Sequence, residues 1–137
     1  MASRAEHSRC TVLLVNDDPE IRRLVKHTLS TERAQILTTG SGARALQIAA
    51  RTPLSLVVLD AKLPDVNGTE ILRRLRAIDA DVPVIFVTSY GSPDSVRAAM
   101  ELGAFDYLTM PVAGEDMSRI VREALASRGA APILLRA

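Results

Sequence analysis

Residues 54–60 read Leu54-Ser55-Leu56-Val57-Val58-Leu59-Asp60, a short apolar run that ends on a carboxylate. A run of this length, rich in Val and Leu and apolar at both odd and even positions, is typical of a strand buried on both faces. Many acidic residues at strand ends simply cap helices or turns. That explanation fits Asp60 poorly, because Asp60 ends the most apolar strand of the chain. We therefore expect Asp60 to define a functional site.

The rest of the chain alternates between strand-like and helix-like segments. Strands are predicted at residues 11–15, 34–38, 54–59, 82–87 and 104–108. Apolar residues at helical spacing predict helices at residues 19–29, 43–51, 68–78, 93–102 and 115–126. Asp18 is expected to cap the first helix before Pro19, and Gly103 to end the fourth. Five β-α units in succession predict an α/β fold: a doubly wound parallel sheet with helices on both faces.

Composition limits the classes of function. The 137 residues are 47% hydrophobic and 24% charged, with a formal net charge of +1. This balance indicates one domain and gives no sign of nucleic-acid or membrane binding. The single cysteine, Cys10, excludes an internal disulfide and a multi-cysteine metal site. The apolar runs are too short to span a membrane, and a cytoplasmic protein is expected.

The ends of the chain carry no clear pattern. Residues 1–10 are mainly polar and are predicted to be disordered. Residues 11–127 are predicted to form the folded domain, and residues 128–137 a C-terminal tail or a truncated linker.

Ligands of doubly wound sheets bind outside the carboxyl ends of the strands. The polar residues that follow the predicted strands are Asn16, Asp17 and Asp18, then Asp60, then Thr88 and Ser89. Carboxylates brought together repel, so this edge favours a cation, and hard oxygen ligands favour Mg²⁺. A carboxylate at such a site can also attack phosphorus and form an aspartyl-phosphate.

The sequence resembles the receiver domains of two-component response regulators over most of its length. The motifs that carry the resemblance are Val15-Asn16-Asp17-Asp18-Pro19, Asp60-Ala61-Lys62-Leu63-Pro64-Asp65-Val66-Asn67-Gly68, Val84-Ile85-Phe86-Val87-Thr88-Ser89 and Gly103-Ala104-Phe105-Asp106-Tyr107-Leu108-Thr109-Met110-Pro111. Four motifs in order, each at a strand end, make this a specific match. The resemblance implies a flavodoxin-like (βα)5 fold, like that of chemotaxis regulators, with strand order 2-1-3-4-5.

The resemblance also implies roles for individual residues. Asp60 matches the aspartate that accepts a phosphoryl group. Asp17 matches a direct Mg²⁺ ligand, and the backbone carbonyl of Lys62 matches another. Thr88 matches the hydroxyl that moves toward the phosphoryl group, and Tyr107 the aromatic residue that changes rotamer with it.

Further implications concern the last strand and the partners. The Met110–Pro111 peptide bond is expected to be cis. A histidine kinase or a phosphotransfer protein is the expected donor. The surface formed by residues 93–126 is expected to switch and to contact an output domain, a partner protein or a second copy. The domain would at most catalyse its own phosphorylation and dephosphorylation.

Two positions depart from the family pattern. When the chain is aligned through Pro19, Asn16 replaces the first residue of the family's acidic pair, which is expected to weaken Mg²⁺ binding and to leave Asn16 as a weak or water-mediated ligand. Pairing Asp17-Asp18 with the acidic pair would instead shift Pro19 by one position. Met110 replaces a lysine that normally pairs with the aspartate and the phosphoryl group, and methionine has no charge with which to do so.

These departures leave two functions open. One is a phosphorylation-dependent switch, which Asp60, Asp17 and Thr88 favour. The other is a phosphorylation-independent interaction module that keeps the fold, which Asn16 and Met110 favour.

Two further positions near the site are predicted to modulate it. Lys62, two residues past Asp60, could supply part of the missing positive charge. Tyr90, two residues past Thr88, could control access of water.

Other activities of the fold class fit less well. No P-loop motif is present. Lys62 stands where haloacid-dehalogenase-type hydrolases carry a second aspartate. A flavin phosphate would meet the acidic residues after the first strand, which repel it unless a cation intervenes.

Overall fold

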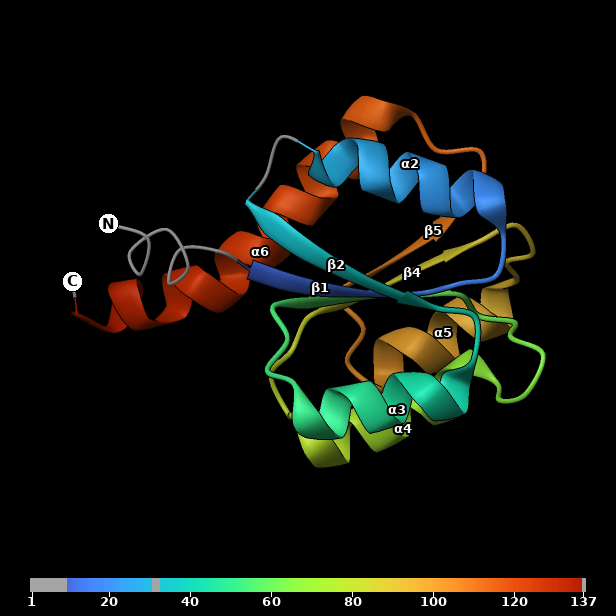
Figure 1. Ribbon diagram of the computed structural model, residues 1–137, viewed down its shortest axis with the longest axis horizontal. Coiled ribbons are helices and arrows are strands. Elements are labelled where there is room, and N and C mark those ends of the chain that lie inside the picture. The colour runs from blue at the N-terminus through green and yellow to red at the C-terminus, as the bar shows by residue number, and fades with distance from the viewer. Residues whose placement is uncertain (1–9, 31–32, 137) are drawn as a thin grey trace.

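Five short strands form one parallel sheet in the computed structural model, which describes residues 10–30 and 33–136 (Figure 1). They are β1 (Cys10–Val15), β2 (Ala34–Thr39), β3 (Leu56–Leu59), β4 (Val84–Thr88) and β5 (Asp106–Thr109). Their order in the sheet is β2-β1-β3-β4-β5, and every adjacent pair is parallel. The predicted fold class and strand order are confirmed.

Five helices cover the two faces of the sheet. They are α2 (Pro19–Leu29), α3 (Gly42–Arg51), α4 (Gly68–Ile78), α5 (Pro93–Glu101) and α6 (Gly114–Arg136). Helices α2 and α6 lie on one face, and α3, α4 and α5 lie on the other (Figure 1). Strand β3 contributes side chains to the hydrophobic cores on both faces of the sheet. Val57 and Leu59 pack in the core beneath α3, α4 and α5 (the α3–α5 core), and Leu56 and Val58 pack in the core beneath α2 and α6 (the α2–α6 core). This explains why both parities of residues 56–59 are apolar.

The predicted helix ends are confirmed at two positions. The Asp18 side chain accepts a hydrogen bond from the N–H of Glu20, and Pro19 opens α2. Gly103 follows α5 with a φ of 89°, a left-handed conformation that side chains with a Cβ rarely adopt.

The chain termini differ in part from the sequence prediction. Cys10 is already the first residue of β1, paired with Ala34, and the rest of the predicted disordered segment lies outside the described residues. Helix α6 continues past residue 126 to Arg136, so most of the predicted tail is helical. Residues of high helix propensity, such as Ala130 and Leu134, favour this extension. No helix within residues 10–30 and 33–136 has the length and apolar character to cross a membrane.

Candidate functional site

Backbone hydrogen bonds bring the predicted site residues to one edge of the sheet. The N–H of Asp60 donates to the carbonyl of Val15 at 2.9 Å, which sets Asp60 beside the end of β1. Thr88 is the last residue of β4, and its carbonyl accepts the N–H of Met110 at 2.8 Å. The carboxyl ends of β1, β3, β4 and β5 therefore meet where the sequence predicts, and the Met110–Pro111 peptide bond is cis, as predicted.

Burial singles out this edge. Asn16, Asp60 and Thr88 are 1%, 7% and 1% exposed. Among the described residues, the only other buried polar or charged side chain is that of Thr28. Asp17 is exposed and Asp18 is half-buried, so both border the site from its open side. Burying polar groups costs free energy, and their concentration beside one carboxylate indicates a functional site.

The Asp60 carboxylate is held by neutral hydrogen-bond donors. Oδ1 accepts the backbone N–H of Lys62 at 3.1 Å, and Oδ2 accepts from the side-chain amide of Asn16 at 3.3 Å. Burial raises the pKa of Asp60, and the charges of Asp17 and Asp18 raise it further. The Lys62 N–H and the Thr88 hydroxyl act in the opposite direction, without cancelling the rise in that pKa.

Gly68 lets helix α4 begin directly against the site. A Cβ at this position would lie 2.7 Å from the carbonyl oxygen of Asp60 and 2.9 Å from the Cα of Ala61. Both atoms belong to the backbone, which cannot move aside as a flexible side chain can. Any side chain at residue 68 would therefore push α4 away from the strand end that carries Asp60.

The two positions that depart from the family pattern have different surroundings. Asn16 is buried at the site, where its Oδ1 accepts the N–H of Asp18 while its Nδ2 faces Asp60. Met110 is partly buried, and it packs against the α2–α6 core. With Leu24 and Val112 it lines a cavity of about 360 Å³ beside α2.

Two residues predicted separately as modulators are in contact. The Lys62 Nζ lies 5.4 Å from the centre of the Tyr90 ring, in a cation–π arrangement. Tyr90 is 70% exposed, so this pair borders the site at the surface. The predicted switch residue Tyr107 stacks on Phe86, with ring centres 5.4 Å apart and an interplanar angle of 8°. Its hydroxyl is buried and has no hydrogen-bond partner among the described residues.

Sequence reasoning missed the contribution of Asp65. This residue follows Asp60 in the β3–α4 loop, and its carboxylate accepts the N–H groups of Gly42 and Ala43 and the hydroxyl of Ser41. The backbone hydrogen bonds lower the pKa of Asp65 to about 2. The loop after the site is thereby fastened to the start of α3. No local pattern predicts a contact between residues 22 to 24 positions apart.

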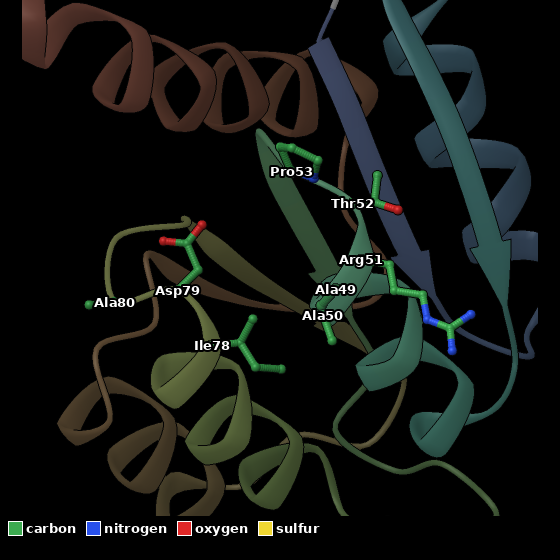
Figure 2. Close-up of a pocket in the computed structure, with 8 residues that line it drawn as sticks. All are labelled: Ala49, Ala50, Arg51, Thr52, Pro53, Ile78, Asp79 and Ala80. Atoms are coloured by element: carbon green, nitrogen blue, oxygen red, sulfur yellow. The ribbon is translucent and has the colours of Figure 1, made fainter.

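A separate hollow lies at the opposite end of the sheet, where α3 and α4 end (Figure 2). Its volume is about 470 Å³. The residues that line it are Ala49, Ala50, Arg51, Thr52, Pro53, Ile78, Asp79 and Ala80. None of the predicted site residues is among them, so the hollow is distinct from the site around Asp60.

Curated relatives share this pattern of sequence. The uncharacterized transcriptional regulatory protein YkoG of Bacillus subtilis is 38% identical over 119 residues, which are 86% of this chain and 52% of YkoG. Sporulation initiation phosphotransferase F of Bacillus subtilis is 33% identical over 114 residues, which are 83% of this chain and 92% of that protein. The chain thus spans about half the length of YkoG, but nearly the whole length of the phosphotransferase.

Solved structures agree with the fold. The CheY-like response regulator receiver domain protein of Methanospirillum hungatei is similar with a TM-score of 0.83 and 27% identity, over 90% of this chain and 98% of that chain. The Mn²⁺-bound form of response regulator Rcp1 is similar with a TM-score of 0.71 and 26% identity, over 85% and 92%. The protein-family model described as the response regulator receiver domain matches residues 12–122 of this chain. With a buried aspartate at the carboxyl end of β3 and this match across most of its length, the chain belongs to the receiver domains of two-component response regulators.

Proposed function

We propose that Asp60 accepts the phosphoryl group in this receiver domain. The observation that carries the proposal is the buried Asp60 carboxylate, which is 7% exposed and takes part in none of the ion pairs of the described residues. A carboxylate oxygen of Asp60 attacks phosphorus of a phosphohistidine. The P–O bond forms, the P–N bond breaks, and its electron pair stays on the imidazole nitrogen. The donor is a histidine kinase or a phosphotransfer protein.

We infer that Mg²⁺ assists at the same edge. No three His, Cys, Asp or Glu side chains of the described residues gather as a metal-binding group. The carboxylates of Asp17 and Asp60 and the backbone carbonyl of Lys62 nevertheless offer hard oxygen ligands, and Mg²⁺ commonly keeps several waters. The Asp17 charge raises the pKa of Asp60, a repulsion that a cation would relieve. When bound, the ion would neutralise charge on the phosphoryl oxygens, and the Mn²⁺-bound form of Rcp1 supports such a site.

The proposed output begins at Thr88 and Tyr107. Thr88 is buried at the same edge as Asp60, and its hydroxyl lowers the pKa of that carboxylate. A phosphoryl group on Asp60 would attract this hydroxyl. The buried hydroxyl of Tyr107 has no partner among the residues that the structure describes, so a change of rotamer would break no hydrogen bond between this hydroxyl and those residues. Movement of this residue would alter the surface formed by α5, β5 and α6. That surface carries the exposed apolar side chains of Val96 and Met100, and it is proposed to meet an output domain, a partner protein or a second copy.

A phosphodonor experiment tests the central proposal. The purified chain is incubated with acetyl phosphate and Mg²⁺, and intact mass is measured. One added phosphoryl group is expected, and it should be absent in Asp60→Ala. The matched control is Asp94→Ala, because the Asp94 side chain is 94% exposed on α5, and this variant should be modified like the parent chain.

The second candidate is a phosphorylation-independent interaction module. It is favoured by Met110, whose side chain packs in an apolar environment and brings no charge to the site. If the parent chain gains no mass with acetyl phosphate or with a phosphorylated histidine donor, this second function replaces the first.

A further inference from the structure

The Asn16 side chain is fixed at both ends of its amide. Its Oδ1 accepts the N–H of Asp18, so its Nδ2 points the other way and donates to Asp60 Oδ2 at 3.3 Å. The backbone is also held, because the N–H of Asn16 donates to Thr39 and its carbonyl accepts from Arg22 Nε at 2.6 Å. At 1% exposure, the amide presents a donor to Asp60 with little freedom to turn away.

An acidic residue at this position would act in the opposite way. Aspartate has the shape of asparagine, so its second oxygen would lie about as far from Asp60 Oδ2 as Nδ2 does now. Two carboxylates at about 3 Å in a buried site repel strongly unless a cation lies between them. Residue 110 cannot supply one here, since Met110 is uncharged and packs against the α2–α6 core.

We propose that Asn16 is a positioning residue whose amide does for Asp60 what a cation at residue 110 would otherwise do, so that Asn16 and Met110 form a compensating pair. The amide holds Oδ2 while the Lys62 N–H holds Oδ1, which orients the carboxylate with neutral donors only. The inference rests on the proposed function of Asp60, and it explains why both departures occur in one chain: either change alone would leave the charge at the site unbalanced.

The pair is tested first by thermal unfolding of the metal-free chain at pH 8. The four proteins are the parent chain, Asn16→Asp, Met110→Lys and the double variant. Asn16→Asp should lower Tm by about 5 °C or more beside Met110, and by less than half as much beside a lysine at residue 110. Residue 110 lies at the same edge of the sheet as Asp60, because the Met110 N–H bonds to the carbonyl of Thr88 at the end of β4, and the long side chain of lysine can turn from there toward the site. An equal fall in Tm in both backgrounds overturns the inference.

The second readout is binding of beryllofluoride with Mg²⁺, followed by calorimetry because the chain contains no Trp. Asn16→Ser keeps an oxygen for the Asp18 N–H but is too short to reach Asp60, and it adds no charge that could prevent folding. It should raise Kd about tenfold beside Met110 and less than about threefold beside a lysine at residue 110. Equal losses in both backgrounds overturn the inference even if Asn16→Asp does not fold. Failure of the parent chain to bind beryllofluoride, with the Tm coupling intact, overturns the proposed function and leaves the pair standing.

Discussion

The carboxylates at the two ends of the sheet, Asp60 and Asp79, have opposite kinds of surroundings. Asp60, at the carboxyl ends of the strands, is buried among neutral donors, and burial raises its pKa. Asp79, at the other end, accepts two hydrogen bonds from Arg128 of α6, at 2.7 and 3.1 Å, which lower its pKa. Among the described residues, Asp60 has no cationic partner, which agrees with its proposed role as the phosphoryl acceptor. Asp79 is fully paired and joins α6 to the end of α4.

Arg76 adds hydrogen bonds at the end of the sheet that carries Asp79, the structural end of the molecule. Its guanidinium donates to the carbonyls of Val82 at 2.7 Å and Gly103 at 2.8 Å. The Asp79 carboxylate also accepts the N–H groups of Asp81 and Val82. Charged side chains therefore fix the loops between α4 and β4 and after α5, at a distance from the proposed chemistry. Among the ion pairs of the described residues, only Arg128–Asp79 joins residues more than four positions apart in the sequence, and it lies at this end of the sheet.

The largest expected effect on stability is at this structural end. Asp79→Ala should lower the free energy of unfolding by about 2 kcal/mol, because it removes a bidentate pair and leaves Arg128 without its partner. Urea unfolding measures the change. Asp94→Ala is the matched control, since the Asp94–Arg97 pair is highly exposed and should contribute less than about 0.5 kcal/mol. Equal effects of the two substitutions would remove the contrast between a structural and an incidental ion pair.

Asp60→Asn should change the free energy of unfolding in the opposite direction. Replacement by a neutral isostere removes the cost of burying a charge while keeping an oxygen for the Lys62 N–H, so unfolding should require about 1 kcal/mol more free energy. The same urea experiment measures it, without Mg²⁺. A clear loss of stability would mean that the Asp60 charge is already compensated in the folded protein.

Of the two ends of the sheet, the sequence alone predicts only the end that carries Asp60. The apolar runs and the parallel topology that they predict place Asn16, Asp60 and Thr88 at one edge. The pairing of Arg128 with Asp79 could not be foreseen, because it joins residues 49 positions apart through a part of α6 that was predicted as a tail. The orientation of the Asn16 side chain could not be predicted either, because the sequence does not show that its amide N–H donates to Asp60.

The pH dependence of stability provides a smaller test, at Asp65. Its pKa is about 2 in the folded chain against an ordinary value of 3.8 for aspartate, so its carboxylate stabilises the fold above pH 3.8. That contribution should fade as the pH falls from 3.8 through about 2. Asp65→Asn should therefore lower Tm near pH 6 and flatten the dependence of Tm on pH below 4. Glu115→Gln, in the exposed first turn of α6, is the control that should leave the profile unchanged.

The smallest expected effect concerns Lys62, at the exposed margin of the site. Its ammonium lies over the Tyr90 ring, and an exposed cation–π contact contributes about 0.5–1 kcal/mol. If the ammonium supplies part of the positive charge that Met110 lacks, Lys62→Ala should slow phosphorylation by acetyl phosphate about two- to fivefold. Tyr90→Phe keeps the ring under the ammonium and should leave the rate unchanged. An unaltered rate in Lys62→Ala would show that the Lys62 ammonium supplies none of the charge that Met110 lacks, which would assign the compensation for Met110 to the Asn16 amide.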